Sequence, residues 1–388
     1  MTRGSLAAAA LGALLAVAPA AARADAHLPP GPLAWRDAGG GGIRGLTVGP
    51  IESTLHPGKG YGSEPCARTM REAATLGANW VSLTPFGRTD SLAPFGVDPT
   101  FEVPFAENRK NVERAVKQAH ENGLRVLLVP HLWVERGGWR GLLDPGDDAA
   151  WARFAKSYRH FVVGWAKVAA AAKVDMLSVG VELRTWVTTT HAPLFLDVIR
   201  DVKRVYGGLL TYAANWDDAD DTVVWGDLDV ISLNAFYPLA NEAGAPLSAA
   251  VEGGARVAAK VRALAESWQK PVMFNEIGYT TRKDTTVEPW LWPDDMKSVT
   301  VDQEAQAEGY LALLAGLLGE PSFAGFFVWR VYADPDDMSQ EAEWGFSPRG
   351  KLAELVMRDA FQRAWAADGD AAWSRETFPP RSVHPGRY

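Results

Sequence analysis

The feature that most constrains the fold is an alternation of short apolar runs with longer amphipathic segments along most of the chain. The short runs have the composition of buried β-strands, and the segments between them have helical periodicity. This alternation predicts βαβ units and a parallel sheet. The expected strands are Ile43–Val48, Trp80–Thr84, Leu124–Pro130, Met176–Glu182, Leu209–Asn215, Val230–Ala235, Val272–Glu276 and Phe323–Trp329. The expected helices are Glu64–Leu76, Phe105–Asn122, Ala149–Ala172, Pro193–Tyr206, Ala249–Trp268, Asp302–Leu318 and, at the end, Lys351–Trp365.

The connecting segments are of two kinds. Helix-to-strand turns are short, as at Asn122-Gly123, whereas strand-to-helix connections are long, as in Pro85–Pro104 and Tyr279–Thr300. Eight strands with intervening helices predict an α/β fold, a (β/α)₈ TIM barrel made of a single domain with long βα loops. A doubly wound sheet is the structural rival. In the barrel, the long loops gather at the C-terminal ends of the strands, where barrel enzymes carry their active sites.

The N-terminus has the pattern of a secretory signal peptide. Arg3 precedes the small-residue apolar run Leu6–Val17, and candidate cleavage sites follow near Ala24 and Ala26. We therefore expect residues 1–26 to be a signal peptide, 27–42 a linker, 43–366 the barrel and 367–388 a C-terminal tail. The expected location is secreted or periplasmic, with no membrane attachment after cleavage. The lone Cys66 cannot form an internal disulfide.

The composition limits the kinds of molecule that the protein is expected to bind. The formal net charge is −8, which argues against binding to nucleic acid or to an anionic membrane surface. The 16 tryptophans are many for 388 residues, and their flat apolar faces suit either core packing or a stacking surface for sugars. We expect a soluble protein, acting as a monomer.

Two expected strands end on a glutamate. Glu182 ends the fourth strand and Glu276 ends the seventh. Either acid alone is more often a solvated residue or a neighbour of a helix N-cap than a catalytic group. Together, at one face of a barrel, they form a pair in which one carboxyl donates a proton and the other, ionised, attacks or stabilises carbon.

An ordered set of motifs makes the chain similar to a known group of enzymes. The motifs are Pro130-His131, Trp139-Arg140-Gly141, Val179-Gly180-Val181-Glu182-Leu183, Tyr212-Ala213-Ala214-Asn215-Trp216, Phe236-Tyr237-Pro238-Leu239, Lys270-Pro271-Val272, Asn275-Glu276-Ile277-Gly278-Tyr279 and Gly325-Phe326-Phe327-Val328-Trp329. With them the chain, from Ile43 to about Trp365, resembles the clan A barrel glycoside hydrolases. It resembles most the family 113 group, which is known for endo-β-1,4-mannanase activity.

This resemblance implies a retaining glycoside hydrolase that cleaves a β-linked polysaccharide. Glu182 would be the acid/base and Glu276 the nucleophile. Many clan relatives carry Asn immediately before the acid/base, where it holds the sugar 2-hydroxyl, but here the residue is Val181. That contact is expected to come from Asn215 or Asn234, or else the substrate preference is altered. β-1,4-Mannan is the expected substrate, with glucan, xylan and galactan as alternatives.

Further candidates for substrate binding lie at or after strand ends, and each has a structural alternative. Tyr237 either hydrogen-bonds the nucleophile or packs under a loop. Trp329 is expected to form the floor for the sugar at the cleavage point, although a tryptophan there can also close the core. Arg140 and Arg184 serve either the substrate or a salt bridge. The complete set of substrate-binding candidates is His131, Trp133, Trp139, Asn215, Trp216, Asn234, Tyr237 and Trp329.

Other chemistry finds little support in the sequence. The seven histidines are scattered, and the chain has neither H-E-x-x-H nor C-x-x-C, so we expect no metal site and no cofactor. The G-x-G-x-x-G match at Gly40–Gly45 precedes its strand instead of following it, which argues against a dinucleotide site. Two functional rivals remain, a carbohydrate-binding barrel without catalysis and a barrel enzyme of unrelated chemistry.

Overall fold

The structure is a computed structural model that describes residues 42–51, 55–101, 103–337, 339 and 341–362. The expected signal peptide, nearly all of the linker and the expected tail lie outside these residues. The strands are β1(Ile43–Gly49), β2(Trp80–Leu83), β3(Phe86–Thr89), β4(Arg125–Leu128), β5(His131–Val134), β6(Met176–Val181), β7(Leu209–Asn215), β8(Ile231–Asn234), β9(Val272–Ile277) and β10(Phe323–Tyr332). The helices are α3(Glu64–Leu76), α4(Phe105–Glu121), α5(Asp148–Ala172), α6(Arg184–Val187), α7(Ala192–Lys203), α8(Leu247–Trp268), α9(Gln303–Leu317) and α10(Leu352–Gln362).

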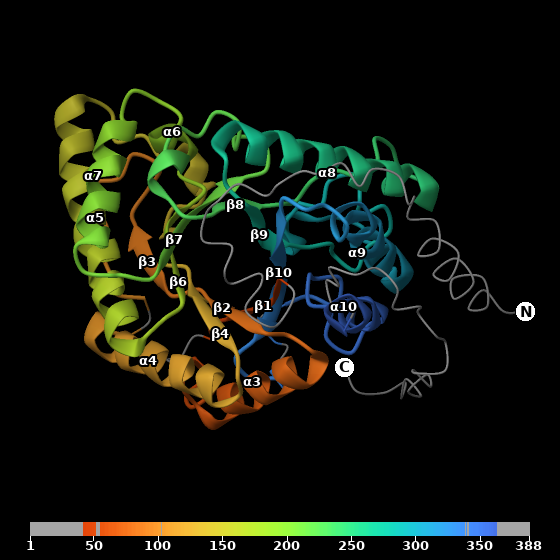
Figure 1. The fold of residues 1–388 in the computed structure, drawn as a ribbon. Helices are drawn as coiled ribbons and strands as arrows, with labels where there is room; N and C mark the ends of the chain where they lie inside the picture. The colour runs from red at the N-terminus through yellow and green to blue at the C-terminus, as the bar shows by residue number, and fades with distance from the viewer. Residues whose placement is uncertain (1–41, 52–54, 102, 338, 340, 363–388) are drawn as a thin grey trace, which may run out of the picture.

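Eight of these strands form a closed parallel barrel within the described part of the chain. Its order is β1, β2, β4, β6, β7, β8, β9, β10, and β10 pairs with β1 to close the ring. The helices surround the strands, with α3 and α4 on one side and α8, α9 and α10 on another (Figure 1). The predicted (β/α)₈ barrel is therefore confirmed, and the doubly wound rival is excluded. In chain order β6 is the fourth barrel strand and β9 the seventh.

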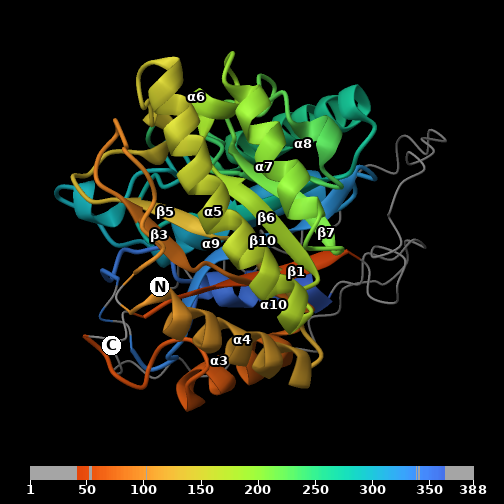
Figure 2. The same ribbon diagram turned by 90° about the vertical axis from the view of Figure 1, so that its left-hand side faces the viewer.

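A second small sheet extends the barrel at two neighbouring strands. β3 follows β2 after Thr84-Pro85, β5 follows β4 after Val129-Pro130, and the two pair in parallel (Figure 2). Proline has no N–H to give to a ladder, so each strand is interrupted at its proline and resumes beyond it. The predicted strands that end at Thr84 and Pro130 therefore extend past the observed ends of β2 and β4. His131 begins β5 instead of lying at the end of the preceding strand.

Helix boundaries differ from the prediction where caps decide them. The Asp147 side chain accepts from the N–H of Ala150, so α5 begins at Asp148, one residue earlier than expected. α7 ends at Lys203 instead of Tyr206. Between β7 and β8, where the sequence signal was weakest, the described chain forms only a 3₁₀ turn, Trp225–Asp227. The last helix ends at Gln362, and its predicted continuation to Trp365 lies outside the described residues.

The core has two layers that matter for the site. The larger one lies between the barrel wall and the helices. The smaller one draws only on residues in or next to barrel strands and fills the barrel interior, namely Ile43, Trp80, Leu127, Val129, Met176, Val181, Ala213, Val230, Met273, Ala324 and Phe327. A dry, filled interior gives the residues above it a rigid floor. Over the described residues, no helix has the length and apolar character needed to cross a membrane.

Candidate active site

The two predicted carboxylates lie at the C-terminal end of the barrel. Glu182 directly follows β6 and is 8% exposed, while Glu276 lies near the end of β9 and is 5% exposed. Glu276 is the register partner of Asn234 on β8, whose side chain reaches Glu182. A carboxylate loses its hydration when buried, so two such groups need polar partners. Those partners define the site.

The backbone at Glu182 has an uncommon conformation. Its φ is +50°, in the left-handed region that non-glycine residues rarely adopt. The register of β6 against β7 shifts between Ser178 and Val181, and the Glu182 N–H then donates to Ala213 at 2.7 Å. Conformations of this kind persist where the surrounding structure holds them, and they cluster at functional sites. Here the turn sets the direction of the Glu182 side chain at the end of β6.

Three donors converge on the Glu182 carboxylate. The Trp139 indole N–H donates to Oε2 at 2.9 Å, and Arg140 Nη1 donates to the same oxygen at 2.8 Å. The Asn234 amide donates to Oε1 at 2.9 Å. Donors thus reach both oxygens of Glu182, one of them a guanidinium, and they fix the position of its side chain.

Asn234 is itself held in place. The Asn275 amide donates to Asn234 Oδ1 at 3.0 Å, so a chain of amides connects β9 with Glu182 through β8. Asn215, the other candidate for this role, instead donates to Asp217 at 2.6 Å. Val181 belongs to the barrel interior and is 2% exposed. Of the two candidate amides, Asn234 is thus the one at the carboxylate.

Glu276 faces a neutral histidine. His131 Nδ1 lies 2.8 Å from the Val129 carbonyl oxygen, which can only accept, so the neutral ring carries its hydrogen on Nδ1. His131 Nε2 is then an acceptor, and it lies 3.3 Å from Glu276 Oε1. Burial, reinforced by Arg140, lowers the pKa of His131 to about 3. The proton that joins these two atoms therefore belongs to Glu276.

The charge state of Glu276 follows from its burial. Burial first, and the neighbouring Glu182 carboxylate second, raise the pKa of Glu276 to about 8, against the opposing effect of Arg140 and Arg330. Near neutral pH Glu276 therefore holds a proton in this environment.

Trp329 lies beside this pair. Its indole stacks on the His131 ring with centroids 6.1 Å apart and an interplanar angle of 28°. The indole is 5% exposed, and among the described residues its N–H has no hydrogen-bond partner. A buried donor without a protein partner is available to a bound ligand. The Arg330 guanidinium lies 5.0 Å from the centroid of the Trp329 ring.

Among the described residues, three other candidates have no hydrogen bond to either glutamate. Trp133, on β5, is 51% exposed and packs edge-on to Phe86. Trp216 packs on Tyr237 and on Trp290. Tyr237 is 4% exposed within the core between the barrel and the helices, with Lys260 of α8 over its ring. The described residues contain no hydrogen bond from Tyr237 to Glu276, so the alternative of a packed tyrosine is the observed one.

Sequence reasoning left some functional residues undecided or unnamed. Arg140 pairs with Glu182, whereas Arg184 pairs with Asp217 and Asp218 and lies over the Trp139 ring at 4.5 Å. Asn275 and Arg330 were not singled out as functional residues. The only available signal for both was position, because each is adjacent to a residue that was identified, Glu276 or Trp329.

Comparison with known proteins identifies the family of this chain. The family model of Glycoside Hydrolase Family 113 matches residues 55–351. The chain belongs to this family. It is therefore an O-glycosyl hydrolase, and the predicted resemblance is confirmed. No curated protein sequence matches the chain.

Solved structures agree with this family 113 assignment. The GH113 β-mannanase AaManA from Alicyclobacillus acidocaldarius, in complex with ManMIm, is 27% identical, with a TM-score of 0.71, and covers 84% of this chain and 98% of its own. A GH113 β-1,4-mannanase complex is 22% identical, with a TM-score of 0.71 and coverages of 83% and 99%. A family 5 mannosidase from Rhizomucor miehei, 12% identical with a TM-score of 0.59 and coverages of 82% and 92%, shares the fold.

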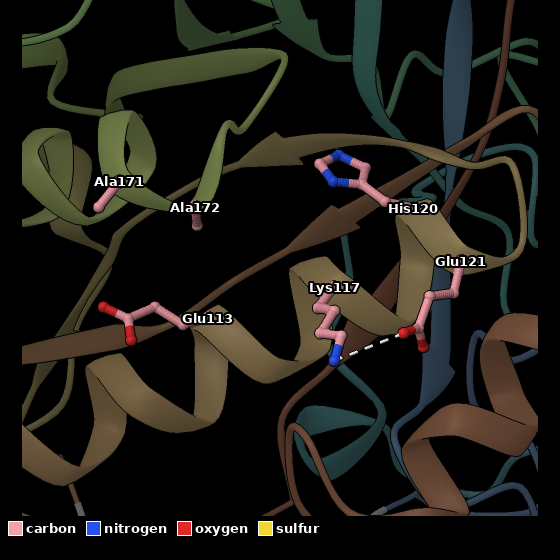
Figure 3. Close-up of a pocket in the computed structure, with 6 residues that line it drawn as sticks. All are labelled: Glu113, Lys117, His120, Glu121, Ala171 and Ala172. Atoms are coloured by element: carbon pink, nitrogen blue, oxygen red, sulfur yellow. Dashed lines mark ion pairs between the residues drawn. The ribbon is translucent and has the colours of Figure 1, made fainter.

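The family 113 site is distinct from a large surface hollow of about 550 Å³. That hollow lies between the C-terminal ends of α4 and α5, which lead into the N-terminal ends of strands, so it opens at the opposite end of the barrel (Figure 3). Lys117 and Glu121 form an ion pair in its wall. Over the described residues, no group of three or more His, Cys, Asp or Glu side chains is arranged to hold a metal ion.

Proposed function

We propose that this family 113 enzyme hydrolyses β-1,4-mannan with retention of configuration, with Glu182 as acid/base and Glu276 as nucleophile. The observation that carries the proposal is the pair of buried glutamates at the ends of the fourth and seventh barrel strands, inside one polar network. The titles of the similar family 113 structures name β-mannanases, which supports mannan as the substrate.

Glycoside cleavage by this pair proceeds in two displacements. Glu182 gives its proton to the glycosidic oxygen while a Glu276 oxygen attacks the anomeric carbon, so the C–O bond to the leaving group breaks as the bond to Glu276 forms. Water then attacks the same carbon, Glu182 takes its proton, and the bond to Glu276 breaks. Two inversions give net retention. The sugar at the cleavage point would lie against Trp329, and its 2-hydroxyl would meet Asn234.

In the structure, the hydrogen bonds of the pair favour the opposite position of the proton. Glu276 carries the proton opposite His131, and Glu182 receives three donors. Substrate binding must therefore transfer the proton within the pair. A sugar ring that develops positive charge favours an ionised Glu276, aided by the nearby positive charges of Arg140 and Arg330. The leaving oxygen beside Glu182 favours a protonated Glu182. The pair needs only one proton for both states.

Two alternatives remain for the substrate and for catalysis. The same machinery would act on another β-glycan, such as glucan, xylan or galactan, if the loops around the cleft select it. A carbohydrate-binding barrel without catalysis is disfavoured because both carboxylates and their polar partners are present. Burial of two acids side by side does not stabilise a fold by itself, so their presence supports a catalytic role.

Kinetics on a panel of β-mannan, glucan, xylan and galactan test the proposal. We expect the wild type to act best on mannan. Glu276→Ala should lose activity on every substrate. Glu182→Ala should still form the glycosyl-enzyme from an aryl β-mannoside whose leaving group needs no proton, and added azide should restore turnover of that intermediate. Full activity of Glu276→Ala would overturn the nucleophile assignment, and preference for another glycan would overturn the substrate.

A polysaccharide substrate fits export of the enzyme, so we propose a secreted or periplasmic monomer. The N-terminal pattern of Arg3 and the run Leu6–Val17 supports export. Fractionation of expressing cells, with N-terminal sequencing of the exported protein, tests it. An uncleaved protein in the cytoplasm would contradict the proposal, and light scattering would check the monomer.

A further inference from the structure

An exposed pair of tryptophans lies near the proposed cleavage site but outside the catalytic pair. Trp290, in the connection between β9 and α9, is 43% exposed. Its ring stacks on that of Trp216, which follows β7, with centroids 5.5 Å apart and an interplanar angle of 26°. One indole supports the other, and the outer one keeps much of its surface open to solvent.

The pair is continuous with the aromatic residues of the site. Trp216 packs against the small apolar cluster formed by Phe236, Trp329 and Phe346, and its ring also contacts Tyr237 at 5.4 Å. An aromatic surface therefore runs from Trp329, beside Glu276 and His131, through Trp216 to Trp290. Gly278 permits this close packing, because a Cβ there would lie 2.8 Å from Phe236 and 2.9 Å from Phe346.

The loop that carries Trp290 is held by polar contacts. Arg282 Nη2 donates to the Glu288 carbonyl at 2.9 Å, and the N–H of Leu291 donates to the same residue. The Trp344 indole N–H donates to the Pro293 carbonyl at 3.1 Å, which ties the loop to the connection after β10. A fixed aromatic surface loses little entropy when a ligand covers it. These contacts hold Trp290 in place for binding.

We propose that Trp216 and Trp290 form a binding platform for a sugar ring of the substrate chain, beyond the ring that lies at Trp329. The expected ligand is a neutral β-linked hexopyranose unit, whose C–H face packs on an indole as an apolar surface. This inference rests on the proposed function, since it assigns a second part of the same polymer to this surface. A chain that spans both places would bind better the longer it is.

Chain-length dependence tests the platform. The kcat/KM of wild type, Trp290→Ala and Trp290→Phe would be measured on β-1,4-mannooligosaccharides from two to six units. Trp290→Ala should lower kcat/KM on the hexasaccharide about 10-fold more than on the shortest hydrolysed oligosaccharide. Trp290→Phe should recover most of that difference. Leu355→Ala, which removes a 50% exposed side chain from α10, is the matched control. It should change kcat/KM on neither the hexasaccharide nor the shortest hydrolysed oligosaccharide.

The outcomes separate the platform from the proposed function. Suppose that the wild type hydrolyses mannan and that Trp290→Ala has an equal effect at every chain length, or no effect at any. That result would overturn the platform and leave the proposed function standing. If the wild type hydrolyses no oligosaccharide, calorimetry would measure mannohexaose binding to two variants. The first is Glu276→Gln, and the second combines Glu276→Gln with Trp290→Ala. Tenfold weaker binding in the second variant would support the platform without the proposed function, and equal binding, or none, would overturn it.

Discussion

The Nε2 atom of His131 lies 3.3 Å from Glu276 Oε1, while Nδ1 of the same ring is committed to the Val129 carbonyl oxygen. This arrangement fixes which of the two residues holds the proton between them. A neutral imidazole with its hydrogen on Nδ1 offers a lone pair to Glu276, so a carboxylic acid fits there and a carboxylate is repelled. The histidine thus favours the protonated state of the proposed nucleophile.

The first prediction concerns the pH dependence of kcat/KM, which reports the free enzyme. The pair is active while it holds one proton, and Glu276 keeps that proton up to a pKa of about 8. We expect kcat/KM on mannan to fall as the pH rises above about 8. His131→Gln should move this limb to lower pH by about one unit, since an amide N–H can donate to the ionised acid. His131→Phe is the control, because the phenyl ring has no N–H to donate to Glu276. Identical limbs in all three proteins would contradict the role of His131.

The second prediction concerns stability. Because the folded-state pKa of Glu276 lies above the unfolded value, its contribution is present below the unfolded pKa of about 4.5 and is lost as pH rises to about 8. Glu276→Gln removes this titration and keeps the shape. We expect the variant to be more stable than the wild type by a few kcal/mol at pH 8, and nearly equal to it at pH 4.5. Thermal unfolding at both pH values measures this, and a difference that does not grow with pH would contradict it.

The third prediction concerns the donor from Trp139 to Glu182. Trp139→Phe keeps a flat aromatic ring and removes the N–H that lies 2.9 Å from Oε2. A hydrogen bond to a charged group contributes about 1.5–3 kcal/mol, so kcat/KM should fall roughly 10- to 100-fold with little change in thermal stability. Trp268→Phe, at the end of α8, is the matched control. Wild-type activity of Trp139→Phe would show that Arg140 and Asn234 suffice.

How much of this site could be predicted from the sequence depends on the kind of signal. Glu182 and Glu276 were found because each ends an apolar run, and strand order in the barrel then paired them. The partner residues had no comparable signal. Asn275 acts through a hydrogen bond to Asn234 on another strand, and Arg330 acts through its charge near Glu276. The left-handed backbone of Glu182 lies at a register shift that no residue type predicts.

The fold was predicted more fully than the site because burial repeats along every strand and helix. The errors lie where a local feature overrides that period. Pro85 and Pro130 lie at the ends of two expected strands, but the chain continues beyond them as β3 and β5, so His131 begins a strand. Tyr237 shows a different limit. Its position after β8 suited either a hydrogen bond to Glu276 or packing under a loop. In the structure the side chain is packed in the core, with Lys260 of α8 over its ring.

The fourth prediction concerns the amides that position Glu182. Asn275 has no contact with Glu182 but donates to Asn234, which does. We expect Asn234→Ala to lower kcat roughly 100-fold and Asn275→Ala roughly 10-fold, with little change in KM. The double variant should be no worse than Asn234→Ala alone, because the two act through one contact. Additive losses in this cycle would mean that Asn275 acts independently of Asn234.

The last prediction concerns Val181, where many relatives in the clan carry Asn. The side chain is 2% exposed and packs in the barrel interior with Val129, Ala213 and their neighbours. In Val181→Asn the amide would enter this apolar layer without a partner, at a cost of about 1–3 kcal/mol. We therefore expect a lower melting temperature and no gain in kcat/KM on mannan, while Val181→Ile should keep activity near wild type. Should Val181→Asn instead raise activity without loss of stability, the backbone here would be able to present an amide to the sugar, and the role proposed for Asn234 would pass to residue 181.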